Sequence, residues 1–133
     1  MSAEPISQDT RTLLTKLSSL LLDQHKLLLD LEKAHYEAAH GSVGSPGQYL
    51  NLVIGDPHFA WLKTLSTLVV EIDEALSRRS KAGQAEAEAL VAQVRAVTGP
   101  FEGGGDFQER YRAAMEGSTE VVVMQGRIAA LVE

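Results

Sequence analysis

The chain of 133 residues contains no cysteine. This absence excludes disulfide bonds, metal sites with thiolate ligands and cysteine nucleophiles in one step. The sequence also lacks a Gly-x-Gly-x-x-Gly pattern, a phosphate-binding loop and a Gly-x-Ser-x-Gly elbow. No short motif therefore predicts nucleotide binding or serine hydrolysis, and the pattern of apolar residues carries most of the information.

Positive charge is scarce relative to negative charge. The 12 Lys and Arg residues stand against 18 Asp and Glu residues, which gives a formal net charge of -6. A protein whose main task is to neutralise nucleic-acid phosphates needs the opposite balance. The one basic group, Arg78, Arg79 and Lys81, is explained by the positive charge that suits a helix C-terminus. We therefore expect no nucleic-acid partner.

Long uncharged apolar runs are missing as well. The most leucine-rich segment contains Lys16, Asp23 and Asp30, so it does not resemble a transmembrane helix. The first ten residues are polar and lack the apolar centre of a secretory signal peptide. We therefore expect a cytoplasmic protein that does not bind a membrane.

Apolar residues make up 44% of the chain and charged residues 23%, which are the proportions of a soluble globular protein. The length suits a single helical domain over residues 1–133, with residues 1–9 as a loosely ordered leader.

The segment from residue 10 to residue 40 organises the predicted domain. Its apolar residues recur at steps of three, four and seven, which indicates one buried face on a helix. The members of this stripe are Leu13, Leu14, Leu17, Leu20, Leu21, Leu27, Leu28, Leu31, Ala34 and Ala38. Gly41 follows where a helix commonly ends, and Ser7, Asp9 and Thr10 are each suitable caps for its start.

Cap and proline pairs start the next two predicted helices. Ser45 and Pro46 precede a short helix that runs to about residue 54. Asp56 and Pro57 begin a longer helix that we expect to end near residue 79.

Three further helices are predicted at residues 84–98, 106–116 and 119–132. Asp106 with Glu109 resembles a capping box at the start of the second of these. The β-branched run in the last one also suits a strand, but nothing else in the chain offers a strand to pair with. The predicted fold class is all-α, a helical bundle of about five to six helices built around one long N-terminal helix.

Several short motifs in the first 76 residues or so resemble those of a family of small all-helical bacterial proteins with no assigned activity. The main one is Asp56-Pro57-x-Phe59-Ala60-Trp61-Leu62-x-x-Leu65-Ser66; others are Tyr36-Glu37, His40-Gly41, Val43-Gly44, Pro46-Gly47 and Ile72-Asp73. The resemblance implies a bacterial, intracellular protein and lends no catalytic residue.

Polar residues gather near one end of the predicted bundle. If the short helix crosses that end, the helix after it runs antiparallel to the first, which brings Glu32, His35 and His58 close together. Glu32 and His35 also have the Glu-x-x-His spacing that places two metal ligands on one helix face. An iron, manganese or zinc site at these three residues is therefore one hypothesis.

A dinuclear site needs a second Glu-x-x-His copy, and the chain has none. We therefore favour a structural role for these residues and predict no cofactor. His35 and Gln24 fall within the apolar stripe, so we expect both to point into the core and to be hydrogen-bonded there.

A second apolar line lies away from the main stripe of the long helix, at Leu22, Leu29 and Tyr36. A helix that is apolar on two sides is either central in its bundle or shared with another subunit. We favour a non-catalytic helical bundle that acts by self-association, most simply as a homodimer, or by binding another protein. The alternative to an interface is that another helix of the same chain covers the line. The alternative function is a bundle that binds a metal or a small ligand through Glu32, His35 and His58. In that alternative the protein could be an enzyme.

Overall fold

The computed structural model describes residues 4–99 and 105–133, and all regular structure in these residues is helical. The helices are α1 (Gln8–His40), α2 (Pro46–Gly55), α3 (Pro57–Ala60), α4 (Lys63–Leu76), α5 (Gln84–Thr98), α6 (Asp106–Gly117) and α7 (Thr119–Val132). The all-α fold around one long N-terminal helix is confirmed. The described residues contain one helix more than the sequence predicts. None of these helices is long and apolar enough to cross a membrane.

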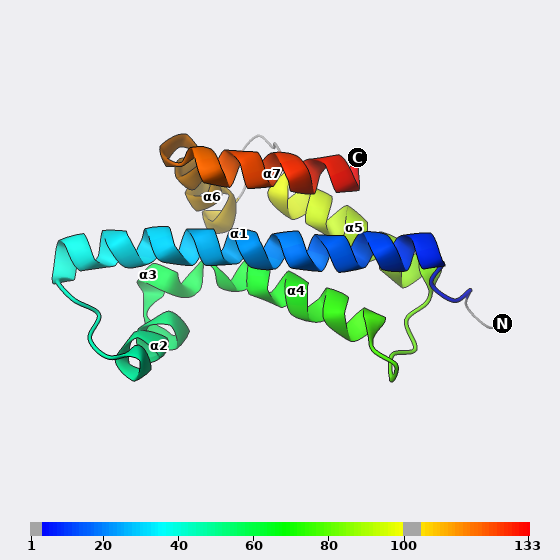
Figure 1. Ribbon diagram of the computed structural model, residues 1–133, viewed down its shortest axis with the longest axis horizontal. Helices are drawn as coiled ribbons and strands as arrows, with labels where there is room; N and C mark the ends of the chain where they lie inside the picture. Colours follow the sequence, from blue (N-terminus) through cyan, green and yellow to red (C-terminus); the bar gives the residue numbers. More distant parts are fainter. Residues whose placement is uncertain (1–3, 100–104) are drawn as a thin grey trace.

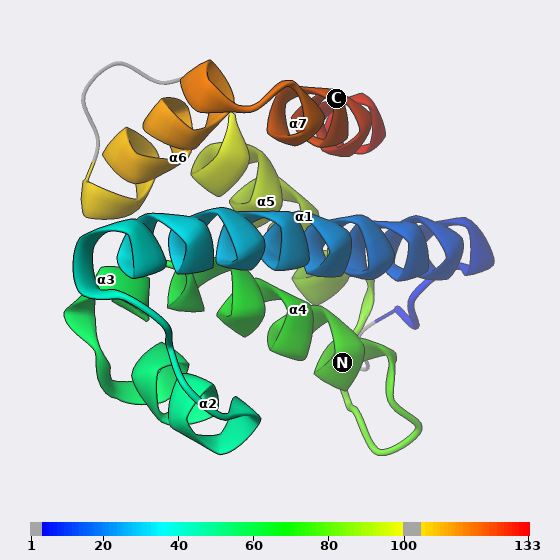
Figure 2. The ribbon, with the colours of Figure 1, turned by 60° about the vertical axis from the view of Figure 1, so that its left-hand side comes forward.

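Helix α1 runs through the middle of the molecule (Figure 1). Helix α4 packs antiparallel to it on one side and α7 antiparallel to it on the other. Helices α2 and α3 lie on the α4 side near the C-terminal end of α1, while α5 crosses α1 obliquely (Figure 2). Because it has neighbours on both sides, α1 is the element on which the rest of the bundle is assembled.

The predicted stripe of α1 forms the centre of the core. Leu14, Leu17, Leu21 and Leu28 are fully buried. Of the three predicted caps, Ser7 is the one used, because its side chain accepts a hydrogen bond from the Thr10 N–H at 3.2 Å. The helix ends at Gly41, whose φ of 83° suits a residue without a side chain.

Residues 4–7 are held more firmly than a loose leader. Ile6 is buried in the core, and the Gln84 N–H donates to the Glu4 carbonyl at 2.8 Å. In return, the Ser7 N–H donates to Gln84 Oε1 at 2.9 Å. One apolar side chain and two hydrogen bonds thus tie the start of the chain to the start of α5. The rest of the predicted leader, residues 1–3, lies outside the described residues.

The single helix predicted from Pro57 to about residue 79 is wrong in two respects. First, it is broken at Trp61 and Leu62 into α3 and α4. Phe59, Trp61 and Leu62 are all buried, whereas in one continuous helix Phe59 and Trp61 would point about 200° apart. The break lets all three enter the core.

Second, α4 ends at Leu76, before the two arginines that the sequence places in its last turn. Ser77 ends it instead, because both its N–H and its hydroxyl donate to the Glu74 carbonyl. This local hydrogen bonding competes with continuation of the helix.

The start of α6 also differs from the prediction. Gly105 occupies the cap position, and its N–H donates to Gln108 Oε1 at 2.9 Å. Asp106 is the first helical residue and not the cap, so its carboxylate is free for another contact. The final helix, α7, has the predicted bounds.

Candidate functional site

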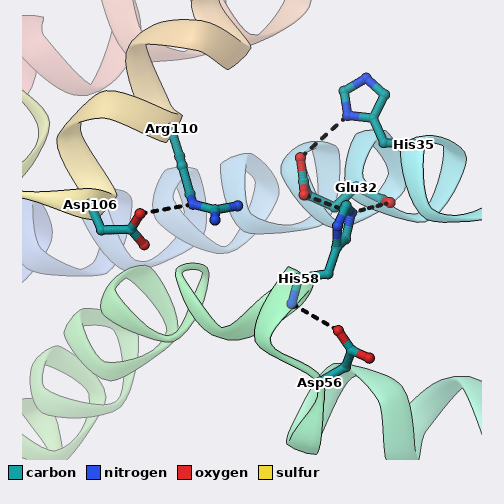
Figure 3. Close-up of polar contacts among 6 residues, drawn as sticks. All are labelled: Glu32, His35, Asp56, His58, Asp106 and Arg110. Atoms are coloured by element: carbon teal, nitrogen blue, oxygen red, sulfur yellow. Dashed lines mark hydrogen bonds and ion pairs between the residues drawn. The ribbon is translucent and has the colours of Figure 1, made fainter. Parts of the chain in front are cut away.

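Glu32 is the centre of a polar cluster at the C-terminal part of α1 (Figure 3). Its carboxylate lies between two imidazoles, with Oε2 at 3.0 Å from His58 Nε2 and Oε1 at 3.4 Å from His35 Nδ1. The Glu32 side chain is only 13% exposed. The structure thus brings together the three residues that the sequence predicts as a site.

The hydrogen bonds of His58 determine which of its nitrogens carries a proton. Its Nε2 also lies 3.1 Å from the Glu32 main-chain carbonyl oxygen. A carbonyl oxygen only accepts hydrogen bonds, so Nε2 must be the donor. A protonated Nε2 has no lone pair to offer a metal, and His58 therefore acts here as a clamp between α3 and α1.

His35 does not point into the core as predicted, because its side chain is 69% exposed. The last turns of α1 extend past α6 and α7 (Figure 1), and His35 borders an open cavity beside α6 instead of a packed helix. Asp56 caps α3 by accepting from the His58 N–H at 2.8 Å. In the described parts of the chain, no three His, Asp or Glu side chains are grouped as a metal ion would require.

A cavity of about 310 Å³ opens beside this cluster. Leu28 and Leu31 of α1 line it together with Ala113 and Ala114 of α6. Its polar residues are Glu32, His35, His58 and Arg110. The cavity therefore combines an apolar lining with groups of both charge signs.

Arg110 is the residue of this cavity that sequence reasoning missed. Its Nε donates to Asp106 Oδ1 at 3.0 Å, within α6 (Figure 3). The spacing of four residues was the available signal for this ion pair. That α6 lies opposite Glu32 is decided only by tertiary packing.

Gln24, by contrast, points into the core as predicted and is fully buried. Its Nε2 donates to Tyr111 Oη at 2.7 Å and to the Val121 carbonyl at 3.0 Å. Tyr111 Oη in turn donates to Gln125 Oε1. Burial raises the pKa of Tyr111 to about 12, although its hydrogen bond with Gln24 acts in the opposite direction. This network joins α1, α6 and α7.

The second apolar line of α1 is only partly open to solvent. Leu22 is 56% exposed, whereas Leu29 and Tyr36 are half-buried and pack against the core. The Tyr36 ring lies against His58 and Phe59, with ring centroids 5.7 Å apart in both pairs. Residues of α3 therefore cover the C-terminal part of the line, and Leu22 is its exposed member.

A groove lies on the opposite flank of α1, between α1 and α7. It encloses about 520 Å³, and Leu27, Val123 and Met124 are its apolar residues. A second hollow continues along the same two helices and is lined by Leu20 and Leu131, among others. Arg127 lines both hollows. We call the two together the α1/α7 groove.

Comparisons with protein families, with curated proteins and with solved structures find no match to this chain. The resemblance to small helical bacterial proteins therefore stays a prediction, and function has to be argued from the geometry alone.

Proposed function

We propose that this protein is a non-catalytic helical module that acts by self-association. The observation that carries the proposal is the α1/α7 groove, which exposes apolar side chains along two antiparallel helices. Val123 in the first hollow is 51% exposed, and Leu20, Leu27 and Met124 are each only partly covered. Exposed apolar side chains gathered in a groove among charged residues are typical of a protein–protein interface.

A second copy of the chain is the simplest partner, because soluble oligomers are most often symmetric homodimers. The resemblance to bacterial helical proteins supports a place in the bacterial cytoplasm as part of the same proposal.

The oligomeric state tests the proposal directly. Sedimentation equilibrium, from micromolar to several hundred micromolar protein, is expected to give a mass that rises from 14.4 kDa toward twice that value. A mass of 14.4 kDa at every concentration would contradict self-association.

A second candidate function is the binding of a small ligand in the cavity beside Glu32; a metal ion held there by His58 Nε2 would first have to displace the proton of that nitrogen. The observation that favours it is the convergence of Glu32, His35 and His58 on a cavity of about 310 Å³. Such a combination of an apolar lining with a few convergent polar groups is typical of ligand sites, although most are larger.

Thermal unfolding measured with one equivalent of iron, manganese or zinc tests the metal form of this candidate. A metal bound at these residues should raise the melting temperature of the wild type and leave that of a Glu32→Gln, His58→Gln variant unchanged. Equal melting curves with and without each metal would exclude metal binding. The same pair of proteins, screened against small carboxylates and amines, tests the ligand form.

A further inference from the structure

The two ends of the α1/α7 groove carry opposite charges. Asp30 and Glu120 lie at the end where α7 begins, Arg127 lies where the two hollows meet, and Lys16 lies in the second hollow. All four side chains are exposed. In the described part of the chain none of them has an ion-pair partner.

The charges on α7 are placed symmetrically about the middle of the first hollow. Glu120 and Arg127 are seven residues apart, which is about 10 Å along a helix and nearly two full turns. Both therefore project from the same face. Their midpoint falls between Val123 and Met124, the apolar residues at the centre.

The same symmetry holds on α1. The midpoint of Leu20 and Leu27 falls beside Asp23, and so does that of Lys16 and Asp30. On α1 the charges are centred on Asp23, which lines the first hollow within about one helical turn of the level of Val123 and Met124. A half-turn about an axis that crosses α1 near Asp23 and α7 near Val123 and Met124 exchanges the acidic and basic ends.

We propose that the α1/α7 groove is a self-complementary interface between two copies of this chain, packed with α1 against α1 and α7 against α7, each pair antiparallel. This rests on the proposed function, self-association, and adds its geometry. Glu120 meets Arg127 of the second copy, and Lys16 meets its Asp30. Between them Leu20 packs on Leu27 of the second copy, and Val123 on its Met124.

Asp23 lies close to the axis, where two like charges would repel each other. Lys26 is three residues away on the same exposed face and also lines the groove. The Lys26 of each copy reaches the Asp23 of the other and neutralises it. A second copy fits better than an unrelated protein because the sign pattern inverts under the rotation, as a symmetric interface requires and a different partner does not.

Charge reversal tests the geometry. Glu120→Arg alone, or Arg127→Glu alone, places like charges opposite each other at two points of the dimer. Each variant is expected to weaken dimerisation about 10- to 100-fold. An equimolar mixture of the two variants restores it, because every reversed side chain then faces one of opposite sign. The Glu120→Arg, Arg127→Glu double variant restores it in a single chain.

Glu74→Arg is the matched control, since Glu74 is exposed on α4, on the other flank of α1. It should dimerise as the wild type does, and circular dichroism confirms that all variants fold. If the wild type dimerises and the single reversals dimerise equally well, or if the mixture stays as weak as its components, the interface is wrong while self-association stands. A wild type that stays at 14.4 kDa overturns both proposals.

Discussion

Gln24 and Glu32 are two polar residues on the same helix, about 12 Å apart along its axis, and the fold treats them differently. The neutral amide of Gln24 is fully buried among α1, α6 and α7, where it donates two hydrogen bonds. The Glu32 side chain is 13% exposed, and its carboxylate lies between two histidines beside a cavity.

The difference follows from the cost of burial. A neutral amide can be buried when its NH2 group is hydrogen-bonded, as in Gln24, even though its Oε1 has no partner among the described residues. A buried charge instead needs an opposite charge or water. The buried site at Gln24 therefore specifies how α1, α6 and α7 pack. The site at Glu32, near the end of α1, is the one open to another molecule. Four changes test this contrast.

The largest effect is expected from Gln24→Glu, which puts a carboxylate of nearly the same shape at the interior site. No cation is among its hydrogen-bond partners, so we expect a loss of about 3–5 kcal/mol in the free energy of unfolding at neutral pH. The loss should disappear below about pH 4.3, the ordinary pKa of glutamate, because the neutral acid is buried easily. Urea denaturation at neutral pH and below about pH 4.3 checks this. A variant as stable as the wild type at neutral pH would show that the Gln24 site accepts a charge.

The next effect is a loss of stability in alkali through Tyr111. Its pKa is raised from 10.0 to about 12 on folding, so the folded state favours the neutral phenol. The associated stability is fully present below pH 10 and is lost as the pH rises toward 12, by about 2–3 kcal/mol in total. Urea denaturation across this range should show a smaller decline in Tyr111→Phe than in the wild type.

His58→Ala is expected to cost about 1–2 kcal/mol. It removes the hydrogen bond from α3 to the Glu32 carbonyl and the ring contacts with Tyr36 and Phe59. His35→Ala is the matched control at the exposed imidazole, and we expect it to change stability by less than about 0.5 kcal/mol. Equal effects of the two changes in thermal unfolding would show that His58 is not the clamp.

The smallest effect should come from Glu32→Gln, the reverse of the first change. The amide still accepts a hydrogen bond from His58, so only the charge is lost, and about 0.5–1 kcal/mol is expected. If Glu32→Gln lowers the free energy of unfolding as much as Gln24→Glu does in the same urea experiment, the surroundings of Glu32 are as inaccessible to water as those of Gln24.

Much of the fold was predictable because helix signals are local. Ser45 with Pro46, Asp56 with Pro57, and Gly41 act within one turn, and each occupies its predicted place in the structure. The break at Trp61 was not predictable in this way. The break allows Phe59, Trp61 and Leu62 to be buried together. Whether all three can be buried depends on the helices packed around them, which no local signal in the sequence shows.

The candidate site was predictable in part. Antiparallel packing brings His58 to Glu32, as the topology suggested, but Arg110 and the cavity depend on where α6 is placed. For His35 the predicted helix face is correct, but the prediction that its side chain points into the core is wrong. The residue lies in the apolar stripe, but it borders the cavity that α6 leaves open and its side chain stays mostly exposed.

By itself, the sequence determined the helices, their central element and the direction in which each side chain leaves its helix, because these depend on neighbours within four residues. Only the tertiary structure decided which of those directions meets another helix and which meets solvent. That depends on the length and offset of helices far apart in the chain. For this reason Gln24 is buried, His35 is exposed, and one flank of α1 forms a groove with α7.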